Sequence, residues 1–435
     1  MATVLSADWV LPVDAPPIAD GAVAIEDGRI AAIGPAAELG AGERFEGGVI
    51  LPGFVNAHSH LEYAVYGGFG DGLPFDRWIL VHIERKSRIG WDEYVAIARA
   101  GAAECLASGI TTVGDASFSG AAAVACDQLG LRGIVYLEVF GRGTDDLETR
   151  FAPNRARIEP HLSERVRLGV SPHAPYSTST ELYAACLELG LPVATHLAES
   201  DAEHEWMRHG TGAWEALGDF FPEPPGETGI RHLGGHGLLA PRMVAAHCVK
   251  ADAEEIALLA EHDVAVAHCP RSNAILGCGI APLRALLDAG LRVGLGTDSP
   301  ASTPSFDVFE ELRTAVFAAR AREARPDALG ADEALELATL GSARALGLGD
   351  EVGSLTPGKR ADLTVLSLAG SPYLPWEDAA TAVVFGGSPE RVLLTMTDGR
   401  TRYRKGGETW PRHELHSAAA SARRRMLALE TPAAS

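Results

Sequence analysis

The chain has 435 residues, of which 46% are apolar and 22% are charged, and this composition excludes a disordered chain or a collagen-like repeat. Its 37 basic and 58 acidic residues give a formal net charge of −21, which argues against a protein that tracks a nucleic-acid backbone. Six cysteines without a CxxC pair fit buried thiols in a reducing compartment. No run of about eighteen apolar residues and no secretory signal pattern occurs, so we expect a cytoplasmic protein without membrane attachment.

The two ends of the chain share one pattern. Residues 1–50 contain short apolar runs with an Asp-Gly pair at 27 and 28, and 346–412 repeat this style with Asp-Gly at 398 and 399. Such runs are typical of small antiparallel sheets with tight turns. We therefore predict one composite β-sandwich domain built from 1–50 and 346–412, followed by a C-terminal helical tail at 413–435.

The middle of the chain, 51–345, repeats a helical stretch, a glycine and a β-branched run. Gly109, Gly130, Gly190 and Gly290 precede such runs, and glycine suits the left-handed residue that ends a helix. Eight strand candidates lie at 49–60, 110–117, 133–141, 166–177, 191–200, 243–250, 264–273 and 292–299. Because parallel neighbours need crossovers, this alternation predicts an α/β fold with a closed (β/α)8 TIM barrel.

Metal-capable side chains stand at the ends of these strands. His58 and His60 are two residues apart on the first strand, so both emerge on the same face. Later strands end in His173, His196, His247, His268 and Asp298. The strand ends of a barrel converge on one mouth, where catalysis takes place, so we predict that these residues surround one site. Long insertions at 61–91 and 201–240 follow strands that end in histidine and are expected to cover it.

Glu199 follows His196 by three residues, in the loop just beyond the strand. A metal with three or four protein ligands and an open position lowers the pKa of its bound water toward ~7 and yields hydroxide. A carboxylate beside that water takes its proton and returns it to a leaving group. We therefore favour a role for Glu199 in proton transfer over a surface ion pair.

The motifs PGFVNAHSH, HLAES, AHC and GLGTDSP together resemble the amidohydrolase superfamily. They are similar to its metal-dependent deaminase and chlorohydrolase branch, which includes S-adenosylhomocysteine/methylthioadenosine deaminases, and the resemblance runs from VAIEDGRIAAIG to GSLTPGKRADLTVL. It implies one divalent metal held by His58, His60, His196 and Asp298. It also implies that Glu199 is the proton shuttle, that His247 orients or polarises the attacked centre, and that Asp298 accepts a proton.

The fourth strand bears on the number of metals. Binuclear members of the superfamily place a carboxylated lysine there, whereas this chain reads SPHAPYS. We therefore expect one metal. Three histidines and an aspartate suit both Zn(II) and Fe(II), of which we favour Zn(II).

The same resemblance implies which residues meet the substrate. SPHAPYS is similar to the segment whose histidine contacts the base in adenosine-type deaminases, which points to His173, with a structural role as its alternative. Ser272 and Asn273 lie in a stretch that is also similar to these deaminases, and they either contact substrate or cap the next helix.

Two further segments extend the predicted substrate site. GLPFDRWILVHIERK is similar to the region that supplies an aromatic wall and a ribose-binding acid, which implies Trp78 and Glu84. Arg142 and Arg150 either meet a negative or polar tail of the substrate or are exposed loop cations.

These inferences lead to one predicted reaction, the hydrolytic deamination of an aminopurine with release of ammonia. The expected substrate is an adenine nucleoside, such as S-adenosylhomocysteine, methylthioadenosine, adenosine or aminodeoxyfutalosine. The alternatives are a guanine- or pterin-type deaminase, a triazine-type chlorohydrolase and a non-catalytic metal-dependent binding protein. Glu199 favours a deaminase, because an amine must be protonated to leave and chloride need not be. The sequence leaves the oligomeric state open, a homo-oligomer included.

Overall fold

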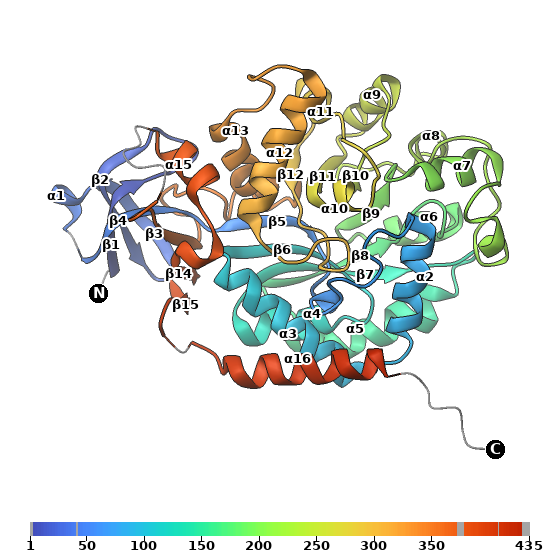
Figure 1. The fold of residues 1–435 in the computed structure, drawn as a ribbon, viewed down its shortest axis with the longest axis horizontal. Helices are drawn as coiled ribbons and strands as arrows, with labels where there is room; N and C mark the ends of the chain where they lie inside the picture. Colours follow the sequence, from blue (N-terminus) through green and yellow to red (C-terminus); the bar gives the residue numbers. More distant parts are fainter. Residues whose placement is uncertain (1–2, 41, 372–377, 408, 429–435) are drawn as a thin grey trace.

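The computed structural model describes residues 3–40, 42–371, 378–407 and 409–428, and Figure 1 shows two sheets side by side with helices around the larger one. The small sheet has seven strands in the order β15-β14-β13-β4-β1-β2-β3. Its strands are β1 (Thr3–Val10), β2 (Ile18–Glu26), β3 (Arg29–Pro35), β4 (Glu43–Pro52), β13 (Leu363–Ser367), β14 (Val392–Thr397) and β15 (Arg400–Arg404). The two ends of the chain therefore build one sheet.

The turns and pairings of this sheet explain its shape. Asp27 and Gly28, and likewise Asp398 and Gly399, have positive φ angles of 48° and 76° and of 48° and 68°, as a two-residue hairpin turn requires. β4 pairs antiparallel with β13. The pairing of β1 with β4 is parallel rather than antiparallel, because β3 runs in the direction of β1 and the connection after β3 leads the chain back to the level of Leu5, where β4 begins in the same direction.

The large sheet has eight parallel strands in the order β12-β11-β10-β9-β8-β7-β6-β5, which confirms the predicted barrel. They are β5 (Phe54–Ser59), β6 (Ile110–Ser117), β7 (Arg132–Val139), β8 (Val166–Pro172), β9 (Val193–Leu197), β10 (Met243–His247), β11 (Ala265–His268) and β12 (Val293–Leu295). A parallel bridge between Ser59 and Asp298 joins the first strand to the segment after the last. This bridge places Asp298 beside the histidines of β5.

Helices cover the outside of the barrel. As predicted, a glycine lies between several of these helices and the strand that follows. Gly109, Gly130, Gly190 and Gly290 all have left-handed φ angles, between 69° and 86°. The helices are α1 (Ala36–Leu39), α2 (Phe75–Lys86), α3 (Trp91–Ala107), α4 (Ala121–Leu129), α5 (Ala152–Ile158), α6 (Thr180–Glu188), α7 (Asp201–His209), α8 (Gly229–Gly235), α9 (Ala253–Glu261), α10 (Pro270–Ile275), α11 (Leu283–Asp288), α12 (Val308–Glu323), α13 (Ala331–Glu336), α14 (Ser342–Ala345), α15 (Ala379–Gly386) and α16 (Arg412–Leu427).

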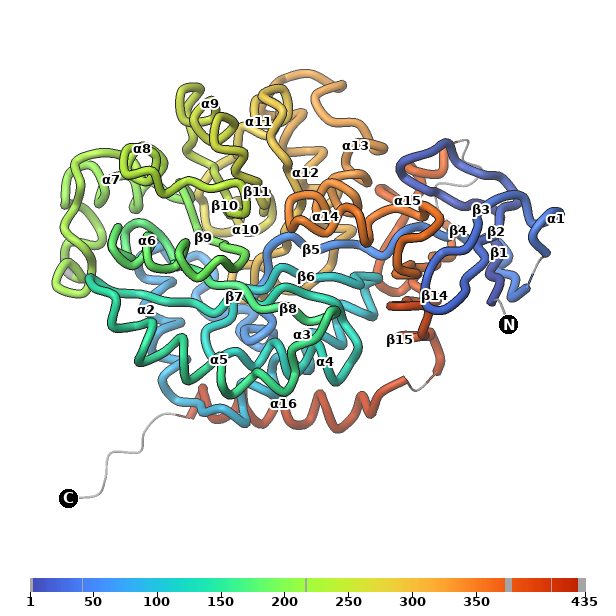
Figure 2. Tube along the Cα trace, turned by 180° about the vertical axis from the view of Figure 1, so that it is seen from behind, coloured from blue at the N-terminus to red at the C-terminus, as the bar shows by residue number. Residues whose placement is uncertain are grey.

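The C-terminal helix α16 accounts for the predicted helical tail as far as residue 427, and residues 429–435 lie outside the described part of the chain. Seen from either side, α16 runs along the edge of the molecule beneath α3, while the small sheet and α7 lie at opposite ends (Figure 2). Leu415, Ala419, Ala422 and Met426 form its buried face. None of the described helices is both long and apolar enough to cross a membrane.

Candidate active site

Four histidines and one aspartate meet at the carboxyl ends of the barrel strands. β5 carries His58 and, just beyond its end, His60; β9 carries His196, β10 ends in His247, and Asp298 follows β12. The His60 Nε2 atom lies 3.3 Å from His196 Nε2 and 3.5 Å from Asp298 Oδ1. His58 Nε2 lies 3.7 Å from the same carboxylate oxygen. The sequence therefore predicted correctly that these side chains are neighbours.

This cluster fits a divalent metal ion. Burial lowers the pKa of His60 and of His196 to about 4, so both rings are neutral and keep a lone pair near pH 7. His58 Nε2 is buried and has no hydrogen-bond partner among the described residues. Buried ring nitrogens that carry a lone pair instead of a proton and converge beside a carboxylate are typical of metal ligands. The residues that could hold the ion are His58, His60, His196 and Asp298.

Hydroxyl groups and a backbone amide fix the Asp298 carboxylate. Ser272 and Ser302 donate hydrogen bonds to Oδ2 at 2.6 and 2.8 Å, and the Ser299 amide donates to Oδ1 at 2.7 Å. Burial acts to raise the pKa of Asp298, but the electrostatic interaction with the neighbouring His60 and His247 rings and the Ser272 hydrogen bond outweigh it and lower the pKa. Asp298 therefore stays ionised in the cluster.

His247 is oriented by Asn273 on α10. Its Nδ1 atom donates to the Asn273 side-chain oxygen at 2.9 Å, so Nε2 carries the free lone pair and lies 3.6 Å from Glu199 Oε1. Ser272 and Asn273, expected to meet substrate or cap a helix, thus bind Asp298 and His247 instead, and neither is among the described residues that line the adjacent pocket.

The backbone is strained at three of these strand ends. Ala198, His247 and Asp298 have φ angles of 51°, 76° and 56°, a region that residues other than glycine rarely adopt. Such a backbone conformation costs on the order of 1–3 kcal/mol per residue and persists because the surrounding contacts hold it in place. Here the Asp298 amide donates to the His58 carbonyl at 3.0 Å, which fixes the strained residue to the first strand.

A second carboxylate, Glu203 of α7, holds the turn that carries Glu199. It accepts hydrogen bonds from the Ala198 amide at 2.9 Å and the Glu199 amide at 2.7 Å. Burial raises the pKa of Glu203 to about 7, and burial together with the charge of Asp298 raises that of Glu199 well above its usual value. Glu203 was not predicted from the sequence, where its position four residues after Glu199 at a helix start was the available signal.

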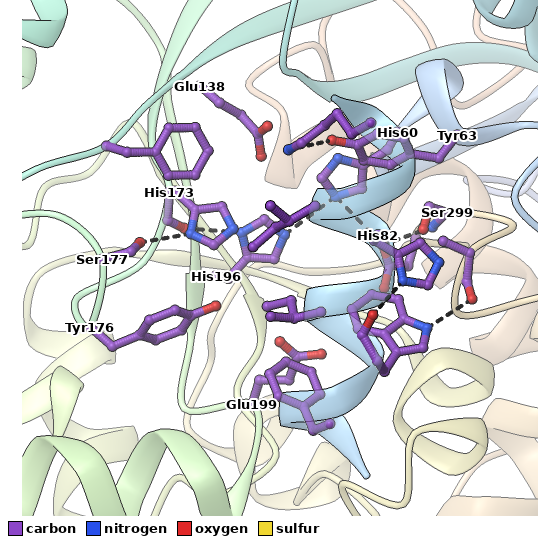
Figure 3. Close-up of a pocket in the computed structure, with 18 of the residues that line it drawn as sticks. His60, Tyr63, His82, Glu138, His173, Tyr176, Ser177, His196, Glu199 and Ser299 are labelled. Carbon is purple, nitrogen blue, oxygen red and sulfur yellow. Dashed lines mark hydrogen bonds and ion pairs between the residues drawn. The ribbon is translucent and has the colours of Figure 1, made fainter. Parts of the chain in front are cut away.

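These groups open into a pocket of about 920 Å³. Figure 3 shows His173, His196 and His60 in a row, with Glu138 on one side of this row and Glu199 on the other. The predicted insertions contribute walls of the pocket, since α2 lies in the first and Phe221 in the second. The residues from α2 are Phe75, Trp78, Ile79, His82, Ile83 and Lys86.

Two of the residues expected to meet substrate line this pocket. The indole nitrogen of Trp78 donates to the Ala301 carbonyl at 3.1 Å, which holds the ring against the wall. His173 Nδ1 forms a 2.7 Å hydrogen bond with Ser177, which leaves Nε2 to face the pocket. His268, by contrast, is buried outside the lining.

The structure does not bring Glu84, Arg142 or Arg150 to the pocket lining. α2 continues as a regular helix to Lys86, so its pocket face holds residues 79, 82, 83 and 86, while Glu84 faces away and pairs with Arg88. Arg142 donates to the carbonyls of Phe221 and Gly218, at 2.5 and 2.7 Å, and so supports a wall of the pocket from outside.

Arg150 is likewise engaged outside the pocket. Its guanidinium pairs with Asp146 at 3.1 Å and lies 4.6 Å from the centre of the Phe118 ring. Two charged residues that the sequence did not single out, Lys86 and Glu138, take part in the lining instead. The signal for Glu138 is an acidic residue in the otherwise apolar strand of 133–141.

Comparisons with known proteins agree with this geometry. The model of the Amidohydrolase family matches residues 49–402, and a shorter match, to an Imidazolonepropionase-like composite domain of bacteria, covers 21–41. A 5'-deoxyadenosine deaminase of Methanothermobacter thermautotrophicus is 34% identical over 90% of this chain and 91% of its own length. A 5-methylthioadenosine/S-adenosylhomocysteine deaminase of Syntrophobacter fumaroxidans is 35% identical over 87% of both chains.

Solved structures show the same fold over almost the entire chain. An adenosine deaminase of Xanthomonas campestris with bound zinc superimposes with a TM-score of 0.88 at 27% identity, covering 98% of this chain and 99% of the other. An atrazine chlorohydrolase of Arthrobacter aurescens has a TM-score of 0.83 at 24% identity, covering 98% and 100%, and shares the fold. With a matched family model over most of its length and relatives above 30% identity, the chain belongs to the amidohydrolase family.

Proposed function

We propose that this protein is a metal-dependent deaminase of adenine nucleosides. The observation that carries the proposal is the meeting of three buried histidine rings, including a His58 Nε2 without a hydrogen-bond partner among the described residues, with an ionised aspartate and a protonatable glutamate at one pocket. A divalent ion, for which we favour zinc, supplies Lewis-acid chemistry there that lowers the pKa of water. Its proposed ligands are His58, His60, His196 and Asp298.

The remaining residues of the site have roles that follow from their positions. In a deamination, water adds to the ring carbon that carries the amino group, the carbon–nitrogen bond breaks, and the nitrogen leaves as ammonia. Glu199, whose raised pKa allows it to hold a proton near neutral pH, transfers that proton to the leaving nitrogen. His247 faces Glu199 and polarises the attacked centre, Asp298 accepts a proton, and His173 contacts the base.

The relatives support the nucleoside assignment, since those reported above are named as deaminases of 5'-deoxyadenosine, methylthioadenosine and S-adenosylhomocysteine. The aromatic and aliphatic wall from α2 suits a purine ring and an apolar substituent. The six cysteines are free and buried, which fits the proposed cytoplasmic location.

The test is ammonia release by protein whose zinc content has been measured. The panel contains adenosine, 5'-deoxyadenosine, methylthioadenosine and S-adenosylhomocysteine, with guanine, a pterin and a chlorinated triazine as competitors. We expect turnover of adenine nucleosides. Turnover of guanine, a pterin or the triazine without turnover of any adenine nucleoside would contradict the proposal.

A further inference from the structure

The pocket contains two opposite charges that the deamination chemistry does not use. Glu138 stands near the end of β7 and is 2% exposed. Lys86 is the last residue of α2. Both side chains line the same cavity as the histidine cluster.

The Lys86 ammonium is fixed by aromatic rings. It lies 3.8 Å from the centre of the Phe118 ring and 5.9 Å from that of Phe140, and it donates a 3.3 Å hydrogen bond to the Tyr63 hydroxyl. These contacts leave an ammonium group with three donors only partly satisfied. Burial lowers the pKa of Lys86, and the negative charge of Glu138 raises it.

The Glu138 carboxylate lies close to His173, which is proposed to contact the base, and to His196, a proposed metal ligand. One of its oxygens and a ring nitrogen of both His173 and His196 lie within 4.8 Å of one another. In the part of the chain that the structure describes, Glu138 accepts no hydrogen bond and forms no ion pair, not even with Lys86. A buried carboxyl group without a hydrogen-bond partner is costly, so a bound ligand is the natural source of the missing hydrogen bonds.

The chemistry of the gap selects the ligand group. Glu138 lacks a hydrogen-bond donor, Lys86 has room for a further acceptor, and no ion pair joins the two side chains in the described part of the chain. A hydroxyl group is both donor and acceptor, and two adjacent hydroxyls span more than one hydrogen bond. A carboxylate or phosphate between Glu138 and Lys86 is disfavoured, because it offers Glu138 no hydrogen-bond donor.

The order of groups along the pocket agrees with this choice. The carbon that carries the amino group must lie at the metal-binding histidines, and His173 borders the rest of the base. Glu138 is beside His173, on the other side of the histidine row from Glu199 (Figure 3). This is where the sugar on the base is expected.

We propose that Glu138 and Lys86 form the sugar subsite of this pocket, in which Glu138 accepts a hydrogen bond from one hydroxyl of a vicinal diol and Lys86 donates one to the other. The inference rests on the proposed nucleoside deaminase function. It assigns the sugar to a β7 carboxylate, whereas the sequence alone had pointed to Glu84, on the outer face of α2.

The test compares adenosine with 2',3'-dideoxyadenosine as substrates of the zinc-loaded protein and of Glu138→Gln, which keeps the size of the side chain. We expect the variant to lose roughly tenfold or more in kcat/KM for adenosine, because it leaves buried hydrogen-bonding groups mismatched. Its kcat/KM for the dideoxy substrate is expected to stay close to that of the unmodified protein. Lys86→Met is expected to show the same pattern.

Zinc content and the thermal midpoint, measured for every variant, detect an unfolded or metal-free protein. Glu188→Gln, at an exposed position of α6, is the matched control. Equal losses of kcat/KM for both substrates in Glu138→Gln overturn the sugar subsite. The sugar subsite is also overturned if Glu84→Gln loses the preference in kcat/KM for adenosine over the dideoxy substrate and Glu138→Gln keeps it.

The outcome with unmodified protein separates this inference from the proposed function. If the zinc-loaded protein releases ammonia from adenosine and from the dideoxy substrate with equal kcat/KM, only the sugar subsite is contradicted. If it releases none from any adenine nucleoside, the deaminase proposal fails and the subsite fails with it.

Discussion

A conservative substitution of Glu199 can distinguish a role in proton transfer from a role in metal binding. Glu199 is buried beside His247 and is not one of the proposed metal ligands, of which His58 and His60 lie beside Asp298. In Glu199→Gln we expect the zinc content to survive and kcat to fall about a hundredfold or more, the usual scale for the loss of a general acid or base.

Elemental analysis and ammonia release from the same preparation test this prediction. His58→Ala is the contrasting variant, because removal of a ligand nitrogen should lower zinc content itself. A Glu199→Gln protein with unchanged turnover excludes Glu199 from the reaction.

Glu203 is predicted to act on the reaction only through the turn that it holds. In Glu203→Ala the amides of Ala198 and Glu199 lose their acceptor, and each unsatisfied buried group costs about 1–3 kcal/mol. We expect kcat to fall roughly tenfold, with KM and zinc content little changed. Glu205→Ala, at an exposed position of the same helix, is the control, and an equal effect in both variants argues against a positioning role.

The helix α2 illustrates how far the sequence could predict the site. The strand-end histidines and Asp298 were predictable, because parallel strands must bring their carboxyl ends to one mouth. Which residues of α2 face the pocket depends on how the helix packs over the barrel, and the helical period that places Lys86 in the lining turns Glu84 outward. Glu138 was missed because an acidic residue inside an apolar strand gives no periodic signal.

The same limit applies to the small sheet. Its two Asp-Gly hairpins were predicted from turn chemistry that acts over a few residues. The parallel pairing of β1 with β4 depends on which strands become neighbours in space, and local residue patterns do not determine that choice.

The C-terminal helix α16 supports α2 from below. Arg85 of α2 and Arg88, two residues beyond its end, donate to the Met426 carbonyl at 2.9 and 3.0 Å, and Arg88 also donates to the Ala428 carbonyl at 3.0 Å. Arg423 donates to the Val65 carbonyl and lies 4.2 Å from the centre of the Phe69 ring. These contacts fix the wall of the pocket rather than the histidine cluster.

We therefore expect the double variant Arg85→Ala and Arg88→Ala to raise KM for an adenine nucleoside several-fold, while kcat and zinc content stay nearly unchanged. Steady-state kinetics separates the two parameters. A fall in kcat with unchanged KM contradicts this role of α16.

The contact between α10 and α12 gives a prediction about pH. Glu311 of α12 accepts a 2.9 Å hydrogen bond from the Arg271 amide, one residue before Ser272, and burial raises its pKa from 4.5 to about 8. A group whose pKa is raised by folding binds its proton more tightly in the folded state. The resulting stability is present below pH 4.5 and is lost as the pH rises toward 8.

Glu311→Gln removes this titration and resembles the protonated carboxyl. Its thermal midpoint relative to that of the unmodified protein is therefore expected to rise between pH 4.5 and 8. Calorimetry across this range checks the sign. A difference that stays constant with pH shows that Glu311 does not titrate there.

The whole molecule contributes a long-range field. Its net charge of −21 repels anions, and among the described residues that line the pocket Lys86 is the one lysine or arginine. We expect adenosine 5'-monophosphate to be deaminated with a kcat/KM at least tenfold below that of adenosine. The gap should narrow as salt screens the field, which kinetics at low and high ionic strength measures. A gap that is absent or insensitive to salt contradicts a role of the net charge.

The pairing of β4 with β13 has a consequence for synthesis on the ribosome. The edge of β4 that receives β13 has no partner until the last part of the chain emerges, although Val49, Ile50 and Leu51 are buried in the finished sheet. At ~5–20 residues per second, this delay lasts on the order of tens of seconds. An unpaired apolar edge is open to wrong partners, so prematurely ended chains that stop before β13 should aggregate although their barrel strands are complete.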